Sequence, residues 1–453
     1  MFLADNLIHK FRMYDANIVL DINSGAVHIF DDMSFEILEL YGELSNEQIA
    51  DKLSDKYSRQ DILESIEEIE TLKADGQLFT EDPYKDYVNL WNKKRVIKAL
   101  CLHISHDCNL RCRYCFAATG NFGGERTMMS PEIGKRAIDM LIRESGNRRN
   151  LEIDFFGGEP LMNFDTVKQI VEYAKSKEKE FNKNFKFTLT TNAILLNDEN
   201  IKYMNENMQN LVLSIDGREA TNDKMRTRVD GKGSYKSILP LIKKVAESRN
   251  QDNYYVRGTF TRENLDFSKD VLHLADEGFK QISVEPVVAA KDTGYDIRKE
   301  DLPAAFKEYE ELALEYVKRD KEGKGFNFFH FMIDLQNGPC ISKRLSGCGS
   351  GDEYVAVTPE GDIYPCHQFV GMKDFKMGNV NHDEIDKSIQ ERFREANVYT
   401  KEECRQCWAR FYCSGGCAAN AFSFNGTIKK PYSIGCELER KRVECSLWIK
   451  TQE

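Results

Sequence analysis

The feature that most constrains this chain is an alternation of short apolar runs with helical patterns. The apolar runs cover 97–104, 151–156, 185–191, 211–215, 254–260 and 281–285. Patterns of helical spacing lie near 130–145, 164–180, 197–208, 234–248 and 266–277, with a further one near 303–319. Because each parallel return needs a crossover, this alternation predicts a parallel α/β sheet. An open partial barrel and a doubly wound sheet both fit, and both bind ligands beyond the carboxyl ends of the strands.

The cysteines are confined to two regions. Of the 13 cysteines in 453 residues, none lies in 1–100, four lie in 101–115 and nine lie in 340–445. Clustered cysteines of this kind indicate metal or redox sites rather than a disulfide framework.

The first group follows the first expected strand. Cys108, Cys112 and Cys115 lie on one short loop, in the spacing CxxxCxxC. Three thiolates can hold a [4Fe–4S] cluster and leave one iron open. The alternative is a structural zinc site, for which a fourth ligand is available among Cys101, His103 and His106.

The second group has the more specific spacing. Twelve residues separate Cys348 from Gly361, and four more precede Cys366. The remaining members are Cys404, Cys407, Cys413 and Cys417, spaced CxxCxxxxxCxxxC, and then Cys436. Zinc ribbons are the alternative to iron–sulfur clusters here too.

The first group resembles the CxxxCxΦC signature of radical S-adenosylmethionine (SAM) enzymes, with the aromatic Tyr114 at Φ. The resemblance implies a partial (β/α)6 barrel and a cluster that cleaves SAM. It further implies that Gly157-Gly158-Glu159 meets the methionine amino group, Ser214 and Asp216 the methionine and ribose, and Arg226 the methionine carboxylate. The full set of expected SAM-binding residues is Tyr114, Gly157, Gly158, Glu159, Pro160, Asn192, Ser214, Asp216, Arg226, Arg257 and Glu285.

The second group is similar to the seven-cysteine SPASM pattern, which implies two auxiliary [4Fe–4S] clusters and three clusters in all. The resemblance implies that Cys366, Cys417 and Cys436 hold the first auxiliary cluster. Cys340 is its fourth ligand, or one iron of the cluster stays open. Cys348, Cys404, Cys407 and Cys413 hold the second. In sulfatase-maturing relatives a catalytic Asp follows the GxxxxC cysteine; here His367 follows it, in a structural or a catalytic role. Cys101 and Cys445 are expected to be incidental.

Residues 1–92 form a distinct acidic module. They hold 7 Lys+Arg and 20 Asp+Glu, a net charge of −13, whereas the rest of the chain sums to +2. Residues 16–31 predict a hairpin around Asn23-Ser24-Gly25, and 58–76 predict a helix that stops at Gly76. Such a charge disfavours nucleic acid as a partner.

The module is similar to the PqqD-like, winged-helix-like recognition elements of ribosomal-peptide maturases. That resemblance implies binding of a precursor peptide's leader as an added strand. A structural cap and a transcription-factor-like domain are the alternatives, and the charge argues against the latter.

The expected domains are therefore 1–92 for peptide recognition, 93–320 for the barrel, 321–345 as a bridge and 346–453 for the SPASM region. This layout resembles the SCIFF maturases, which implies thioether crosslinks between a cysteine sulfur and a carbon in a Cys-rich precursor peptide. It also implies an external electron donor of flavodoxin or ferredoxin type. Other radical peptide modification, by C–C crosslinking or formylglycine formation, and a zinc-binding scaffold are the alternatives. No apolar run approaches the ~20 residues of a membrane span and no secretory signal is seen, so we expect a cytoplasmic protein without membrane partners.

Overall fold

A computed structural model describes residues 7–88, 95–335, 341–382 and 384–453. Cys340 therefore lies outside the described residues. Ten strands form one sheet in the order β12-β11-β10-β8-β7-β6-β4-β13-β14-β15. The six that the sequence predicts are β4 (Ala99–Ser105), β6 (Asn150–Gly157), β7 (Asn184–Thr191), β8 (Asn210–Ser214), β10 (Tyr254–Phe260) and β11 (Gln281–Pro286).

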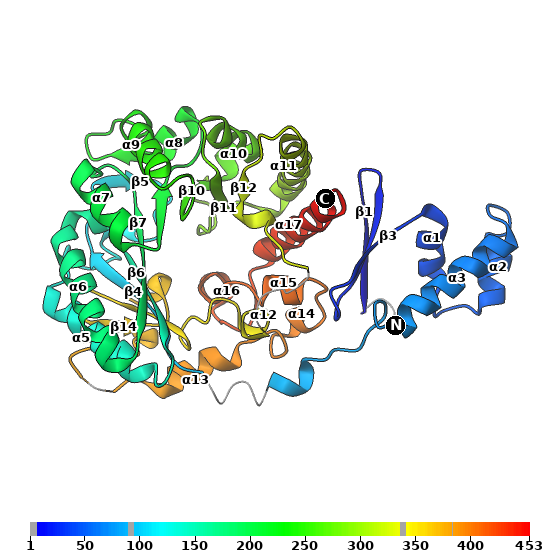
Figure 1. Cartoon of the computed structure of the whole chain (residues 1–453), viewed down its shortest axis with the longest axis horizontal. Coiled ribbons are helices and arrows are strands. Elements are labelled where there is room, and N and C mark those ends of the chain that lie inside the picture. The colour runs from blue at the N-terminus through cyan, green and yellow to red at the C-terminus, as the bar shows by residue number, and fades with distance from the viewer. Residues whose placement is uncertain (1–6, 89–94, 336–340, 383) are drawn as a thin grey trace.

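These six strands are parallel and stand side by side in chain order. A doubly wound sheet reverses its strand order at a switch point, and this sheet does not. All crossovers therefore run in one direction and place the helices on the outer side of a curved sheet, as in a partial barrel (Figure 1). The helices are α5 (Pro131–Glu144), α6 (Phe164–Phe181), α7 (Asp198–Asn207), α8 (Glu219–Met225), α9 (Tyr235–Ser248), α10 (Phe267–Asp276) and α11 (Leu302–Lys321).

The two faces of the sheet differ in polarity. On β6, Leu151, Ile153 and Phe155 are fully buried under the helices, whereas Glu152 and Asp154 alternate with them on the inner face. A parallel strand that is buried on both faces has a nearly continuous run of apolar residues in its sequence. The alternation shows that the inner face is polar and partly open along β6, whereas the neighbouring β4 is buried on both faces.

The sheet continues beyond the predicted barrel. β12 (Asn327–Phe328) pairs with β11, and β13 (Tyr354–Val357) pairs in parallel with β4. β14 (Asp362–Tyr364) and β15 (Gly378–Asn379) follow in antiparallel fashion. The sheet thus crosses the expected boundary at residue 346. The remaining helices are α12 (Ile341–Ser346), α13 (Lys387–Glu395), α14 (Glu402–Arg405), α15 (Arg410–Cys413), α16 (Ala418–Asn425) and α17 (Ser433–Thr451).

The N-terminal part has three antiparallel strands followed by three helices. The predicted hairpin is present as β2 (Ala16–Asp21) and β3 (Val27–Phe30), and a further strand, β1 (Ile8–Met13), pairs with β2. α1 (Asp32–Leu40), α2 (Asn46–Leu53) and α3 (Arg59–Ala74) follow. Ser58 caps α3 and Gly76 follows its end with φ +68°, as the sequence predicts. The likeness to a winged helix stays a prediction.

This small sheet packs directly on the C-terminal region. The His9 ring stacks on Trp408 with 3.7 Å between centroids. The Arg410 Nη2 donates to Asn23 Oδ1 at 2.6 Å, and Leu20 packs against Val443 of α17. The N-terminal strands therefore contact the loop that carries Cys407 and Cys413.

Within the described residues, no helix is both long and apolar enough to cross a bilayer.

Candidate active site

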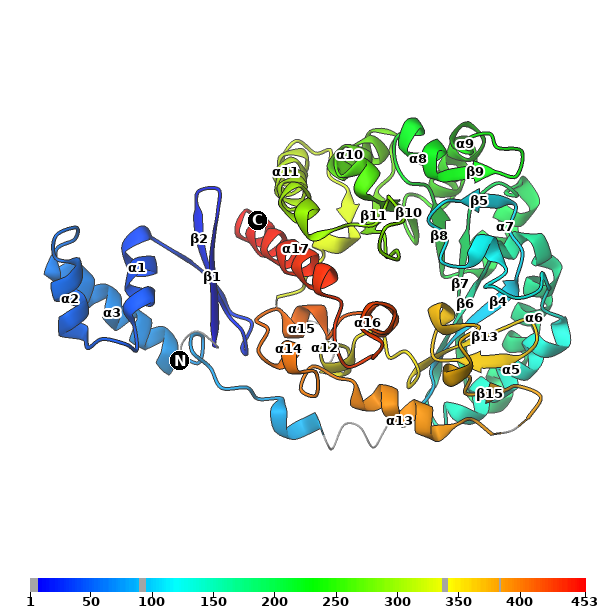
Figure 2. The same ribbon diagram turned by 180° about the vertical axis from the view of Figure 1, so that it is seen from behind.

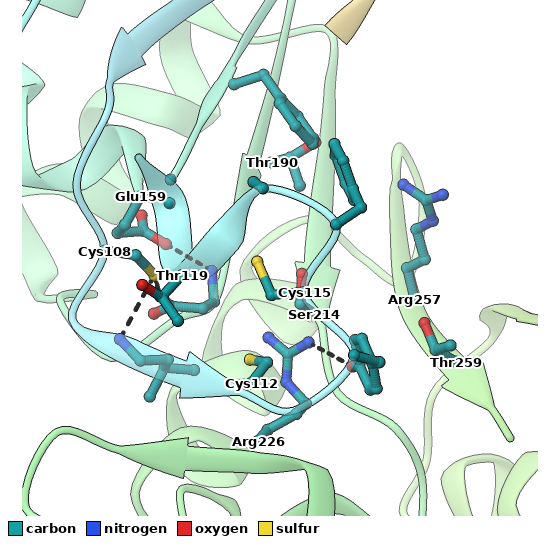
Figure 3. A pocket seen from close by; sticks show the side chains of 18 of the residues that line it. Cys108, Cys112, Cys115, Thr119, Glu159, Thr190, Ser214, Arg226, Arg257 and Thr259 are labelled. Atoms are coloured by element: carbon teal, nitrogen blue, oxygen red, sulfur yellow. Dashed lines mark hydrogen bonds between the residues drawn. The ribbon is translucent and has the colours of Figure 1, made fainter. Parts of the chain in front are cut away.

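A cavity of about 240 Å³ opens at the carboxyl ends of the parallel strands. Cys108, Cys112 and Cys115 all line it, with Cys112 and Cys115 on the same side of the space (Figure 3). Burial raises the pKa of Cys108 to about 12 and that of Cys112 to about 11. Metal ligation requires thiolates, so binding of a metal centre at these two cysteines is coupled to loss of their protons.

Two glycines let the end of β6 lie against the thiol-bearing loop. Gly158 N donates to Ser105 O at 2.7 Å, and Gly157 has φ +121°. A Cβ on Gly158 would lie 2.1 Å from Asp107 O, and one on Gly157 would lie 2.3 Å from Ser105 O. Only glycine permits this approach of two backbones. The Gly-Gly pair therefore places the residue before Cys108.

We expect Gly158→Ala to destabilise the fold by about 3 kcal/mol or more, because the new methyl group would overlap a backbone carbonyl that cannot move away alone. Gly124→Ala, in the segment between β5 (Leu110–Cys112) and α5, is the matched control, since its Cβ would approach nothing closer than Asn121 O at 3.6 Å. Thermal unfolding of the two variants measures the difference. Equal stabilities would show that the loop yields easily.

Glu159 ties the ends of two strands together. Its fully buried carboxylate accepts hydrogen bonds from Leu161 N at 3.0 Å, Thr191 Oγ1 at 2.8 Å and Asn192 N at 2.8 Å. Burial raises the pKa of Glu159, although these bonds oppose the shift. A carboxylate has about four acceptor positions, so capacity for about one further donor remains toward the cavity.

Tyr114, Asp216 and Arg226 form a buried network beside Cys112. The Tyr114 hydroxyl donates to Asp216 at 2.7 Å, and Arg226 Nη1 donates to that hydroxyl at 3.0 Å. Burial raises the pKa of Asp216 to about 6, against the effect of the Arg226 guanidinium. Arg226 Nε is buried and has no hydrogen-bond partner. Arg226 thus has a free donor next to the cavity.

Two predicted contacts do not match this geometry. Asp216 is fully buried behind Tyr114, where it also accepts from Thr259 N at 3.1 Å, and it does not line the cavity. Pro160 is buried too and does not line it. Asp216 is therefore placed to orient Tyr114 and Arg226 rather than to touch a ribose.

The opposite wall carries Arg257 on β10 (Figure 3), and its ion-pair partner Glu285 on β11 lines the same cavity. They form a bidentate ion pair with N–O distances of 3.2 and 3.0 Å, and their side chains are 44% and 37% exposed. Burial raises the pKa of Glu285, but Arg257, His330 and Arg442 lower it to about 2. Arg257 is thus already paired, which leaves it fewer free donors for SAM.

His367 also lines the cavity. Its ring packs against Phe116 and Phe156, with centroid distances of 5.4 and 4.9 Å. Burial, with a smaller effect of Arg257, lowers its pKa to about 4, and its Nδ1 has no partner. His367 therefore stands neutral at the wall that the barrel shares with the C-terminal region.

The other predicted residues and some unpredicted ones complete the wall. Asn192 Nδ2 donates to Asn109 Oδ1 at 2.7 Å and lies 3.5 Å from Cys108 Sγ. Ser214 lines the cavity at the end of β8. Because side chains two residues apart on a strand share a face, the position of Asn192 could have predicted that Thr190 lines the cavity. No pattern in the sequence predicts that Val287, Val288 or Gln368 line it.

Three thiols on one loop, a free buried guanidinium nitrogen and glycine-lined backbone fit an iron–sulfur cluster with SAM at its open iron. This fit rests on the donors that line the cavity. Among the described residues, no three His, Cys, Asp or Glu side chains converge closely enough to hold a single metal ion.

A second cavity of about 440 Å³ adjoins the first. Both are lined by Glu285, Pro286, Val287 and Val288. The thiols of the second cavity are Cys348, Cys413, Cys417 and Cys436. The end of β11 is thus a wall common to both groups of cysteines.

The C-terminal thiols are grouped differently from the sequence prediction. Cys404, Cys407, Cys413 and Cys436 surround one small cavity of about 40 Å³. In this four-thiol set burial raises the pKa values of Cys413 and Cys436, and the charges of Cys404 and Cys407 add to both shifts.

The remaining cysteines form a three-thiol set. The charges of Cys417 and Cys348 add to burial in raising the pKa of Cys366 to about 12. Cys436 and Cys348 have therefore exchanged groups relative to the prediction. The cause is α17, whose first turn brings Cys436 back over the loop that follows α14.

Comparison with known proteins identifies two regions. Residues 102–271 match the radical SAM superfamily, and residues 348–408 match the SPASM iron–sulfur cluster-binding domain. A cysteine-type anaerobic sulfatase-maturating enzyme of Clostridium novyi is 24% identical over 70% of this chain and 86% of its own. The subtilosin biosynthesis protein AlbA of Bacillus subtilis is 22% identical over 77% and 78%.

Two solved structures show the same fold. anSMEcpe with bound AdoMet has a TM-score of 0.64 at 19% identity, covering 77% of this chain and 96% of its own. Streptococcus suis SuiB bound to its precursor peptide SuiA has a TM-score of 0.53 at 17% identity, covering 96% and 100%. The SuiB match extends over the N-terminal strands and helices as well.

Proposed function

Since this chain is a radical SAM enzyme that also carries a SPASM iron–sulfur domain, we propose that it forms thioether crosslinks in a Cys-rich, ribosomally made precursor peptide. Its relatives include peptide-modifying enzymes such as the sulfatase maturases and a bacteriocin biosynthesis protein. Bound at Cys108, Cys112 and Cys115, a [4Fe–4S] cluster with SAM supplies a 5′-deoxyadenosyl radical.

The observation that carries the proposal is the wall common to the two cavities. Glu285–Val288 line both the space around Cys108, Cys112 and Cys115 and the space beside Cys348 and Cys417. A peptide residue in the first cavity and a peptide cysteine in the second would therefore be neighbours. The three-thiol set leaves a cluster one ligand short among the described residues, and thiolates are natural iron ligands.

The chain's own residues position the cluster-binding loop and SAM. The Gly157-Gly158 pair and Glu159 fix the thiol loop, and Arg226 offers a donor for an anionic group of SAM. Phe116, Phe156 and His367 pack together and form an aromatic side to the cavity.

Mass spectrometry of a Cys-rich precursor peptide, after anaerobic reaction with the enzyme, SAM and reductant, tests the proposal. Each thioether removes two hydrogens and one alkylatable thiol, and the loss survives treatment with a reducing agent. A C–C crosslink also removes two hydrogens but leaves every thiol open to alkylation. Formylglycine formation from cysteine replaces the thiol sulfur by an aldehyde oxygen with loss of two hydrogens. Formation from serine removes two hydrogens and leaves every thiol open to alkylation, but its aldehyde reacts with a hydrazine, which a C–C crosslink does not. Either of these two results would replace the proposed reaction by the corresponding alternative.

We also propose that the acidic N-terminal module binds the leader of that peptide. Its three-stranded sheet has edges at β1 and β3, and Ile29 on β3 is 59% exposed. An added strand would gain main-chain hydrogen bonds, and the charge of −13 on residues 1–92 would attract a basic leader. The SuiB structure, whose match includes this region, contains a precursor peptide.

Ile29→Ser is expected to weaken leader binding about tenfold, because burying an isoleucine side chain contributes about 1.5–3 kcal/mol. Fluorescence polarisation of a labelled leader measures the effect. Leu314→Ser is the matched control, since Leu314 is 47% exposed on α11, outside the module. Unchanged affinity in Ile29→Ser would place the leader elsewhere.

A further inference from the structure

Two exposed apolar side chains lie on the inner side of the barrel, just after its edge strand β12. Phe329 is 51% exposed and Met332 is 57% exposed. The rings of Phe329 and Tyr255 meet edge to face at a centroid distance of 5.5 Å, and the Tyr255 hydroxyl donates to Met332 Sδ at 3.7 Å. Tyr255 precedes Arg257 by two residues on β10 and so shares its face, which lines the first cavity. Tyr255, Phe329 and Met332 therefore form one apolar track on the concave side of the sheet.

The two residues between these exposed side chains are held in place by the core. His330 Nδ1 accepts a hydrogen bond from Arg442 Nη1 of α17 at 2.9 Å, because a guanidinium can only donate. His330 Nε2 therefore carries the proton and donates to Ser283 Oγ of β11 at 3.2 Å. Phe331 is buried. Because both intervening side chains are fixed between β11 and α17, the exposure of the apolar track is set by the fold.

One end of the apolar track opens into the second cavity. Phe329 lines that cavity together with Cys348 and Cys417 of the three-thiol set. The wall Glu285–Val288, which the first cavity shares, lines it as well. A peptide chain that lies over Phe329 therefore enters the space beside these thiols and the common wall directly.

The other end of the apolar track reaches the N-terminal sheet. Ile333, the residue after Met332, packs against the apolar cluster that Leu20 of β2 forms with α17, and Val27 of β3 packs against the same cluster. Val27 and Ile29 lie two residues apart on β3 and so share a face. Figure 2 shows the N-terminal strands on one side of α17 and β11 on its other side. The exposed Ile29 is thus linked to the track by apolar side chains on one side of the small sheet.

We propose that the apolar track binds the precursor peptide in the segment between its leader and the residues that are crosslinked. The inference rests on the proposed function, with the leader at the edge of β3 and the reacting residues in the two cavities. A peptide bound in this way has to pass from Ile29 to the second cavity, and the track lies between these two points. A peptide that covers Phe329 and Met332 removes apolar area from water. The unbranched thioether of Met332 adapts to different shapes, so the track favours apolar peptide side chains rather than one fixed sequence.

Fluorescence polarisation on the reconstituted holoenzyme tests the track with two labelled probes, the Cys-rich precursor peptide and its leader alone. The wild-type enzyme should bind the precursor about tenfold more tightly than the leader, because only the precursor buries the side chains of the track. Phe329→Ser with Met332→Ser should abolish this difference and leave the affinity for the leader unchanged. Phe181→Ser with Val229→Ser is the matched control, since both are exposed apolar side chains, at the end of α6 and just after β9 (Arg226–Arg228).

A conservative variant distinguishes the loss of apolar area from a change in local structure. Phe329→Leu with Met332→Leu keeps apolar side chains at both positions and should retain most of the preference for the precursor. If the serine variant kept the full preference, the track would be overturned and the leader site would stand. If the wild-type enzyme did not bind the leader, the proposed leader site would be overturned, and the track with it. Loss of a dimer in the serine variant, seen by sedimentation velocity with unchanged affinity for the precursor, would replace the peptide on the track by a second copy of this chain.

Discussion

A variant in which Cys108, Cys112 and Cys115 are all alanine is expected to form no 5′-deoxyadenosine from SAM. These thiols line the first cavity, whereas Cys348 and Cys417 of the three-thiol set and all members of the four-thiol set line other spaces. The variant should therefore keep the iron-based absorption of the SPASM region and lose about four of about twelve irons. Iron and sulfide analysis, with chromatography of the SAM products, measures both effects.

Cys445→Ala is the matched control, because Cys445 is fully buried on α17 and lines none of the three cavities. It should keep its full iron content. Formation of 5′-deoxyadenosine by the triple variant would mean that the cluster that cleaves SAM is held elsewhere. Stoichiometric zinc with little iron in the wild-type protein would contradict all of the cluster assignments.

The grouping of the C-terminal thiols gives the second large effect. Cys404→Ala with Cys436→Ala should remove the ligands of one cluster only, and so about four irons, because both belong to the four-thiol set. Cys366→Ala with Cys436→Ala should remove about eight, because the two residues belong to different sets.

The grouping expected from the sequence makes the reverse prediction. There Cys366 and Cys436 share a cluster, so their joint replacement would cost about four irons and that of Cys404 and Cys436 about eight. Iron content of the two double variants, reconstituted side by side, therefore distinguishes the two arrangements. Each double variant serves as the control for the other.

Most of the barrel could be predicted because its signals are local. Runs such as 151–156 and 254–260 predicted β6 and β10 to within one residue, since one face of each strand is buried by helices and alternates with a polar inner face. The residues after these strands, such as Gly158 and Glu159, could be assigned to one cavity because parallel strands end at one edge of the sheet.

The remainder depends on contacts between distant segments. β13 joins the sheet beside β4 through only four residues, and β5 and β9 have three each, too few to show a period. The spacing of residues along the chain does not show that the Asp216 side chain lies behind Tyr114. It also does not show that the first turn of α17 places Cys436 beside Cys404. Such contacts between distant segments leave no local pattern in the sequence.

The contact of the N-terminal sheet with the loop from Cys407 to Cys413 has a consequence for cooperativity. Trp408 stacks on His9 and Arg410 donates a hydrogen bond to Asn23. These contacts need an ordered segment from Cys407 to Cys413, both of which line the same small cavity. If oxygen destroys the cluster there, this order is lost and the amides of β1 and β2 should exchange their hydrogens faster. Damage by air would then loosen the segment that we propose to bind the leader, and the affinity for the precursor peptide should fall when this cluster is lost.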